Sequence, residues 1–154
     1  MNESITDSCG ESALKVDTSE SDLAVFRGLK VLVVDDSASM LHVLKEYLAR
    51  MGMGSVTAAK NGEEAWGLIQ GEGKFDLIIS DWKMPRLSGI ELLDKVRKES
   101  GTPAVPFVLV TSEAKTDSIL MAGKHSATAY IVKPFCFAEL VVTIRQIFVD
   151  TSGQ

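Results

Sequence analysis

Hydrophobic and polar residues follow two alternating patterns over most of this 154-residue chain. Five short runs are almost entirely apolar and rich in β-branched residues, and each is followed by a segment whose apolar residues recur every three or four positions. The runs predict buried strands, and the segments predict amphipathic helices. The predicted strands are 29–34, 55–59, 75–80, 105–111 and 128–133, and the helices that follow them are 37–52, 61–73, 88–100, 112–126 and 135–149.

This regular alternation of strand and helix predicts a parallel sheet with helices on both faces. The strands are apolar along their whole length, as expected when both faces of a sheet are covered. Five strands and five helices in about 120 residues fit a flavodoxin-like, doubly wound α/β fold. We therefore expect a three-layer α/β/α domain with the strand order 2-1-3-4-5.

The first 26 residues have a different composition, rich in Ser, Thr, Asp and Glu. They carry six acidic residues and one lysine, which accounts for the whole net charge of −5 and leaves the rest of the chain neutral. We expect a disordered tail over 1–27, one domain over 28–150 and a short C-terminal tail over 151–154. A neutral domain lacks the basic field that binding to nucleic acid requires.

No apolar stretch approaches the ~20 residues that cross a bilayer, and the N-terminus has no basic start or apolar segment typical of a signal peptide. We therefore expect a cytoplasmic protein without a membrane partner. Two cysteines are present, Cys9 and Cys136, far apart in the sequence and without the spacing of metal ligands. Two free thiols in a reducing compartment are the interpretation that this pattern favours.

Polar side chains follow four of the five predicted strands. Asp35 and Asp36 come after the first strand, Asp81 after the third, Thr111 ends the fourth, and Lys133 ends the fifth. In a sheet of this type, ligands bind at the carboxyl ends of the strands, near the point where the strand order reverses. We expect these five residues to meet there.

Such a group of residues suits phosphoryl chemistry. Three crowded carboxylates repel one another, and a hard divalent cation such as Mg²⁺ relieves the repulsion. Lys133 adds a second cation and Thr111 a hydroxyl, so together they can surround a phosphoryl group carried by a carboxylate. Asp81, on the central strand, is the candidate nucleophile. Each residue alone has an ordinary alternative, since an acidic pair after a strand often caps a helix.

Four segments resemble the receiver domains of bacterial two-component response regulators, especially stand-alone, CheY-like regulators of the chemotaxis type. The resemblance implies that Asp81 is the phosphoacceptor and a metal ligand. It also implies that Asp36 binds Mg²⁺ directly, that Asp35 acts largely through water, and that Lys83 offers its backbone carbonyl to the metal. The segments are VLVVDDS, DLIISDWKMPRLSGIELL, VLVTSEAK and AYIVKPF.

The same resemblance gives roles to residues of the last two strands. Thr111 would bind a phosphoryl oxygen, and Lys133 would pair with the phosphoryl group. The peptide bond from Lys133 to Pro134 is often cis in this family. Tyr130 matches the switch aromatic, which moves inward when Thr111 is drawn to the phosphoryl group. Without the resemblance, Tyr130 would be interpreted as a half-buried strand residue with a solvated hydroxyl.

Two positions beside the site depart from the common pattern. Lys83 stands where chemotaxis regulators often have Asn, and Glu113 stands two residues after Thr111. The family varies both positions to tune the lifetime of the phosphoryl group. We hypothesise an ion pair between Lys83 and Glu113 over the site, with two independent surface charges as an equal alternative.

The resemblance implies a phosphoacceptor signalling protein that catalyses only its own phosphorylation and dephosphorylation. Its partners would be a histidine kinase, a phosphatase, and a downstream target bound through the face of 112–126, 128–133 and 135–149, with the flagellar motor switch as the chemotaxis example. A phosphate sink or relay receiver without direct output is an alternative. A Mg²⁺-dependent phosphohydrolase of small molecules is a weaker one, because such enzymes usually carry a D-x-D motif with the nucleophile after the first strand. A flavin-binding flavodoxin is disfavoured by the acidic loop at 35–39.

Overall fold

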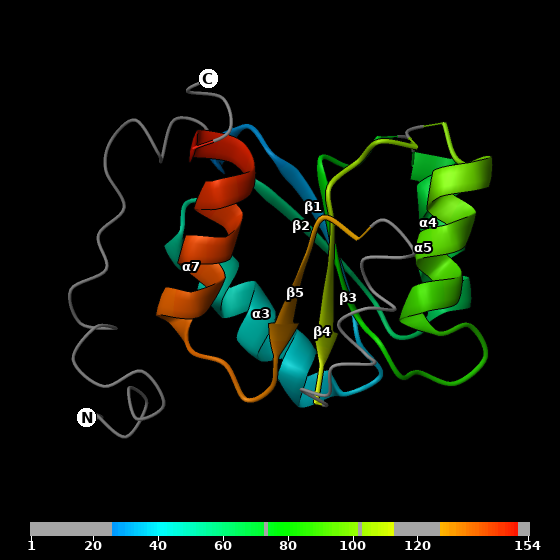
Figure 1. Ribbon diagram of the computed structural model, residues 1–154, viewed down its shortest axis with the longest axis horizontal. Coiled ribbons are helices and arrows are strands. Elements are labelled where there is room, and N and C mark those ends of the chain that lie inside the picture. Colours follow the sequence, from blue (N-terminus) through cyan, green and yellow to red (C-terminus); the bar gives the residue numbers. More distant parts are fainter. Residues whose placement is uncertain (1–25, 73, 102, 113–126, 151–154) are drawn as a thin grey trace.

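The computed structural model describes residues 26–72, 74–101, 103–112 and 127–150. Residues 1–25 of the predicted tail over 1–27, the predicted tail over 151–154, and most of the predicted helix over 112–126 lie outside these residues. The strands and helices of the described part follow in the predicted order (Figure 1). They are β1 Lys30–Val34, α3 Ala38–Arg50, β2 Ser55–Ala59, α4 Gly62–Glu72, β3 Leu77–Asp81, α5 Gly89–Glu99, β4 Phe107–Thr111, β5 Ala129–Val132, α7 Phe137–Arg145 and a π-helical turn Gln146–Asp150.

The five strands form one parallel sheet with the order β2-β1-β3-β4-β5, as predicted. Helices α3 and α7 cover one face of the sheet, and α4 and α5 cover the other (Figure 1). β3 lies at the centre, between β1 and β4. The structure therefore confirms the flavodoxin-like fold class.

Alternate residues of β1, β3 and β4 enter two separate hydrophobic clusters. Val31 and Val33 of β1 point into the cluster under α3 and α7, whereas Leu32 and Val34 point into the cluster under α4 and α5. All four side chains are fully buried. Successive side chains of a strand point to opposite faces, so a sheet covered on both sides needs apolar residues at every position. This geometry explains why the strands read as continuous apolar runs.

Side chains at the helix starts hold several loops in place. Ser37 accepts a hydrogen bond from the Met40 amide through its hydroxyl oxygen, at 3.3 Å, and so caps α3. Asn61 accepts from the amide of Glu64 at 2.8 Å, at the predicted start of α4. Such caps satisfy amides that have no partner in the first helical turn.

The last helix differs from the prediction in its start. The prediction began it at residue 135, but α7 begins at Phe137. The amide of Cys136 donates a hydrogen bond to Oε1 of Glu139 at 3.1 Å, which fixes the start of the helix after Cys136. None of the helices in the described part combines the length and apolar character needed to cross a bilayer.

Cys136 corrects one expectation. The sequence favoured free thiols, but Cys136 is disulfide-bonded in the structure. The prediction rested on the distance between the two cysteines along the chain. That distance does not limit which residues a fold brings together, so it was a poor guide to pairing.

Candidate functional site

The two central strands bring the predicted carboxylates side by side. β1 and β3 pair Val34 with Ser80, so Asp35 and Asp81 follow at matching positions at the carboxyl edge of the sheet. Asp35, Asp36 and Asp81 each offer a carboxylate oxygen, and these oxygens lie within 4.8 Å of one another. Asp35 is buried, Asp81 is half-buried and Asp36 is exposed. The cluster is therefore open to solvent on the side of Asp36.

Lys133 bridges two of the three carboxylates. Its Nζ lies 3.1 Å from Oδ2 of Asp35 and 3.3 Å from Oδ1 of Asp81. Burial would lower the pKa of Lys133, but the hydrogen bond and charge of Asp35, together with Asp81, outweigh burial and raise it. The side chain therefore stays a cation throughout the neutral pH range. Because its ammonium group is held in place between two carboxylates, Lys133 can bind an anionic group that enters the site.

Asp35 is held firmly although it is only 1% exposed. Its Oδ1 accepts a hydrogen bond from the Ser37 amide at 2.9 Å, and its Oδ2 accepts from Lys133. Its own amide donates to the carbonyl of Ala59 at 3.1 Å. Charge-assisted hydrogen bonds of this kind offset the cost of burying a carboxylate.

Asp81 is held less tightly and remains reachable. Its side chain is 12% exposed, and its Oδ1 accepts from the Trp82 amide at 3.0 Å as well as from Lys133. Burial, followed by the negative charge of Asp35, raises the pKa of Asp81, and these effects outweigh Lys133 and the Trp82 amide. The ionised carboxylate of Asp81 is thus less favourable in the folded protein than in water, and a cation bound beside it would stabilise it.

The three carboxylates form a donor set that suits a hard cation. All of the donors in the cluster are oxygens, as Mg²⁺ prefers, whereas soft metals favour sulfur or imidazole. Because Asp36 is exposed, the site leaves room for the waters that Mg²⁺ retains. The residues present therefore fit a magnesium ion.

Thr111 and Tyr130 lie on the neighbouring strands. The carbonyl of Thr111 accepts a hydrogen bond from the Lys133 amide at 2.7 Å, and Thr111 is 5% exposed. Tyr130, on the edge strand β5, is 40% exposed. The Lys133–Pro134 peptide is cis, as the resemblance implied.

The tuning hypothesis remains untested by this geometry. Lys83 lies in the loop after β3 and is exposed. Glu113 lies outside the described residues, so the Lys83–Glu113 ion pair stays a prediction.

The sequence did not single out Gly89, at the start of α5. A Cβ atom at this position would lie 2.2 Å from the carbonyl oxygen of Asp81 and 3.0 Å from Cα of Trp82. The Gly89 amide donates to the carbonyl of Trp82 at 2.8 Å. Only glycine lets α5 start this close to the candidate nucleophile. The signal was a glycine at the first position of a strong helix pattern, where glycine is a poor helix former.

The loop after β3 is also fastened to α4, which the sequence did not indicate. Arg86 adopts a φ of 73°, in the left-handed region that non-glycine residues rarely occupy. Its guanidinium lies 3.1 Å from Oε1 of Glu63. The carbonyl oxygen of Leu87, in the same loop, approaches Gly62 closely. A Cβ added at Gly62 would lie 2.3 Å from this oxygen. The loop that follows Asp81 is thus held at two points on the start of α4.

Comparison with known proteins points to one family. Residues 31–145 match the response regulator receiver domain. A chemotaxis protein CheY homolog of Campylobacter jejuni is 36% identical over 126 residues, covering 82% of this chain and 97% of that protein. Two solved structures are also similar. Vibrio cholerae chemotaxis protein CheY4 has a TM-score of 0.72 and 32% identity, and the match covers 78% of this chain and 98% of that chain. The receiver domain of Francisella response regulator 1452 has a TM-score of 0.72 and 31% identity, and the match covers 80% of this chain and 99% of that chain.

The fold, the acidic cluster with its bridging lysine, and the matched residues lead to the same conclusion. This chain belongs to the response regulator receiver-domain family, and its relatives include CheY-type chemotaxis proteins.

Proposed function

We propose that this protein accepts a phosphoryl group on Asp81 from the phosphohistidine of a histidine kinase, with Mg²⁺ bound, and signals by binding a target protein. The observation that carries the proposal is the site itself. Three carboxylate oxygens lie within 4.8 Å of one another, and Lys133 lies within 3.3 Å of two of these carboxylates. Phosphoryl transfer needs little beyond alignment and charge neutralisation, and this cluster supplies both.

Asp81 acts as the nucleophile through the oxygen that is left free. The contacts that described residues make to this carboxylate reach Oδ1, from Lys133 and the Trp82 amide. These contacts orient the group and leave Oδ2 to attack phosphorus in line. A bond forms between Oδ2 and phosphorus while the bond from phosphorus to the donor's imidazole nitrogen breaks. Lys133 then pairs with the phosphoryl oxygens, and the acyl phosphate is later hydrolysed by water.

The magnesium site is assigned to Asp35, Asp36 and Asp81, with the backbone carbonyl of Lys83 as a further ligand. When bound, Mg²⁺ supplies positive charge that offsets the repulsion between these carboxylates and the phosphoryl group. Asp35 contributes mainly as a fixed charge that orients water, because both of its oxygens already accept hydrogen bonds.

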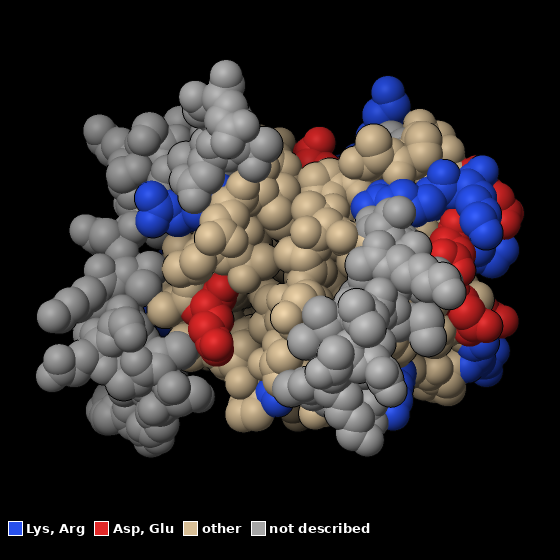
Figure 2. Space-filling model, in the orientation of Figure 1, with Lys and Arg blue, Asp and Glu red and all other residues tan. Residues whose placement is uncertain are grey.

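Thr111 and Tyr130 form the switch in this proposal. The Thr111 hydroxyl donates a hydrogen bond to the new phosphoryl group, and Tyr130 moves inward from its exposed position. Tyr130 and Val142 are the large hydrophobic side chains exposed in the described part. Figure 2 shows a largely uncharged band over β5 and α7. This surface would bind the target, because Tyr130 and Val142 offer it exposed hydrophobic side chains and aromatic side chains are enriched at interfaces.

The chemotaxis relatives support a chemotaxis-type output in the cytoplasm, with the flagellar motor switch as the target to test first and a phosphatase as a further partner. The protein would be a signalling protein and not an enzyme acting on other molecules. A phosphate sink without direct output remains the second candidate. A pull-down with phosphorylated and unphosphorylated protein separates the two, because only direct output requires a partner that binds the phosphorylated form.

The first test is the intact mass of the purified protein after incubation with acetyl phosphate. The proposal predicts a gain of one phosphoryl group that requires Mg²⁺ and is removed by chelation. Asp81→Asn should abolish the gain, whereas Asp76→Asn, at the opposite end of β3, should leave it intact. A gain in the Asp81→Asn protein, or no gain in the wild type with either acetyl phosphate or a cognate kinase, would contradict the proposal.

A further inference from the structure

The loop after β3 is joined to the start of α4 by a salt bridge, with Nη1 of Arg86 3.1 Å from Oε1 of Glu63. The same loop carries Lys83, whose carbonyl is assigned to the metal. We propose that Glu63 and Arg86 form a positioning pair that holds this loop in the conformation that binds Mg²⁺. The inference rests on the proposed magnesium site and names two residues that act on it through the loop.

The base of the loop is fixed independently of this pair. The Gly89 amide donates to the carbonyl of Trp82, and the Trp82 amide donates to the carbonyl of Val110, both at 2.8 Å. The Trp82 side chain packs against the hydrophobic cluster under α4 and α5. The conformation of residues 83–88 therefore depends on the contacts that these residues make themselves.

The tip of the loop is a strained turn centred on Arg86. The φ of this residue is 73°, in a region that non-glycine residues rarely adopt. The Leu87 amide donates to the carbonyl of Pro85 at 2.9 Å, and with this φ the three residues form the rare type of γ-turn in which the central φ is positive. Such a conformation persists only where surrounding contacts over-determine it. The salt bridge starts from the central residue of the turn and is one of those contacts.

A close backbone approach accompanies the salt bridge. A Cβ atom added at Gly62, the buried first residue of α4, would lie 2.3 Å from the carbonyl oxygen of Leu87 and 2.6 Å from its Cβ. Gly62 and Leu87 each neighbour one member of the pair, Glu63 and Arg86. The backbone contact and the ion pair therefore fasten the same two points of the chain to each other.

The two glutamates in the first turn of α4 make different contacts. Oε1 of Glu64 accepts a hydrogen bond from the Lys60 amide at 2.7 Å, so this side chain turns back to the start of its own helix. Glu63 reaches across to Arg86 instead. The helix dipole favours a negative charge in the first turn. Glu63 is therefore the carboxylate that α4 presents to the loop.

The start of α4 is in turn tied to the acidic residues that follow β1. The Asp35 amide donates to the carbonyl of Ala59, the last residue of β2, at 3.1 Å, and Ala59 is buried. The salt bridge thus connects the side of the site that carries Asp35 to the side that carries Asp81. A metal ion needs ligands from both sides at once. A contact that fixes one side relative to the other reduces the ordering that metal binding requires.

The size of the effect is limited by exposure of the pair. The side chains of Arg86 and Glu63 are 65% and 60% exposed, and ion pairs of this kind are weak. A contact can shift the affinity for Mg²⁺ only by the free energy with which it favours the conformation that binds. Loss of the pair should therefore weaken Mg²⁺ binding about two- to fivefold.

The test is a titration with MgCl₂ followed by heteronuclear NMR. The Trp82 amide is the reporter, because it donates to Oδ1 of Asp81 at 3.0 Å. Glu63→Gln and Arg86→Gln should each raise the Kd for Mg²⁺ about two- to fivefold, and the double variant should be no weaker than either single one. The shared direction is decisive. Side chains that acted only through their charges would give opposite effects, with weaker binding in Glu63→Gln and tighter binding in Arg86→Gln.

A second readout needs no metal. The Leu87 amide closes the turn around Arg86, so its hydrogen exchange in the metal-free protein should be at least about twofold faster in Glu63→Gln and in Arg86→Gln. The Thr128 amide, bonded to the carbonyl of Phe107 at the opposite edge of the sheet, should exchange equally in all variants. Arg86→Lys keeps the cation and should lie nearer to the wild type than to Arg86→Gln in both readouts.

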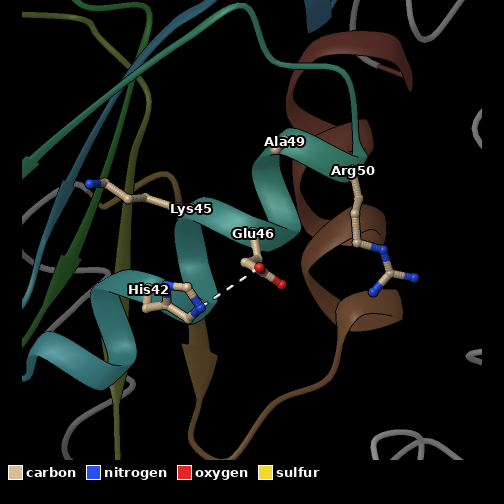
Figure 3. Close-up of a pocket in the computed structure, with 5 residues that line it drawn as sticks. All are labelled: His42, Lys45, Glu46, Ala49 and Arg50. Atoms are coloured by element: carbon tan, nitrogen blue, oxygen red, sulfur yellow. Dashed lines mark ion pairs between the residues drawn. The ribbon is translucent and has the colours of Figure 1, made fainter. Parts of the chain in front are cut away.

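Two matched substitutions control for net charge. Glu46→Gln neutralises an exposed carboxylate that faces His42 at 3.7 Å on α3 (Figure 3), and Lys98→Gln removes an exposed cation from α5. Neither should change the Kd for Mg²⁺ or the exchange of Leu87. Tighter binding in Arg86→Gln, an unchanged Kd in both variants of the pair, or unchanged exchange at Leu87 would overturn the proposal and leave the magnesium site in place. Absence of Mg²⁺ binding by the wild type would instead contradict the proposed function, and this inference with it.

Discussion

Replacing Asp81 by Asn should stabilise the protein when no divalent cation is present. Asn keeps the shape of the side chain and can still accept the hydrogen bond from the Trp82 amide, but it removes one of three clustered negative charges. Lys133 remains paired with Asp35 at 3.1 Å, so the substitution leaves no unpaired ammonium. Asp81, the proposed phosphoacceptor, is therefore expected to lower the free energy of unfolding of the metal-free protein.

The magnitude follows from the distances. At an effective dielectric constant of about 20, Lys133 attracts Asp81 across 3.3 Å by about 5 kcal/mol. Asp35, with an oxygen within 4.8 Å, repels Asp81 by about 3.5 kcal/mol, and the exposed Asp36 adds about 1 kcal/mol in a water-like dielectric. The attraction by Lys133 and the repulsion by Asp35 and Asp36 nearly cancel. The cost of burying the carboxylate therefore decides whether ionised Asp81 stabilises or destabilises the fold. We expect Asp81→Asn to raise the free energy of unfolding by about 1 kcal/mol, or about 3 °C in Tm.

The pH dependence gives an independent check of the sign. Burial and Asp35 raise the pKa of Asp81 in the folded protein. A raised pKa means that folding favours the protonated form, so the wild type loses stability as pH rises through the folded-state pKa. The advantage of Asp81→Asn should be full at pH values above the folded-state pKa of Asp81 and should vanish as pH falls below the unfolded-state pKa of the carboxyl group.

Urea unfolding in a chelator, followed by circular dichroism, measures the effect. Glu46→Gln, which neutralises an exposed carboxylate on α3, should change stability by less than about 0.5 kcal/mol and is the control. Mg²⁺ at about a hundred times its Kd should stabilise the wild type by about 2.7 kcal/mol, and Asp81→Asn should lose most of that gain. Destabilisation of the metal-free protein by Asp81→Asn would refute the electrostatic account of the site.

Three further substitutions test other parts of the structure. Lys133→Met leaves the buried Asp35 without its cation and should destabilise the protein by about 3 kcal/mol in urea unfolding; an unchanged midpoint would show that the pair contributes little. Gly89→Ala places a Cβ 2.2 Å from the Asp81 carbonyl oxygen and should lower the free energy of unfolding by about 2 kcal/mol. The control Gly67→Ala, in open space on α4, should raise the free energy of unfolding by up to about 1 kcal/mol. Similar effects of the two substitutions on thermal unfolding would mean that α5 can shift to make room for the added Cβ. Tyr130→Ala should leave Tm within about 2 °C because the ring is 40% exposed, yet should reduce target binding by the phosphorylated protein; undiminished binding in a pull-down would remove Tyr130 from the switch.

The fold could be predicted because its determinants are local and repeated. Each strand is a short apolar run, and α3 and α4 begin at recognisable caps, Ser37 and Asn61. A parallel sheet then places all carboxyl ends at one edge, so residues distant in sequence are brought together by topology alone. This is why Asp35, Asp81 and Lys133 could be grouped before any distance was known.

Other features depend on contacts that no local pattern records. The need for glycine at position 89 arises because α5 starts against the carbonyl of Asp81, and this approach is visible only in three dimensions. The bonding state of Cys136 was interpreted wrongly from sequence spacing. Arg86 has a positive φ and its guanidinium pairs with Glu63 on another element, and the loop sequence alone indicated neither feature.

The central claim is that Asp81 itself carries the phosphoryl group. Borohydride converts an acyl phosphate on aspartate to homoserine, which marks the position permanently in a peptide mass map. After incubation with Mg²⁺ and acetyl phosphate, the account predicts homoserine at position 81 and unchanged aspartate at positions 35 and 36. Homoserine at another position, with aspartate retained at position 81, would contradict it.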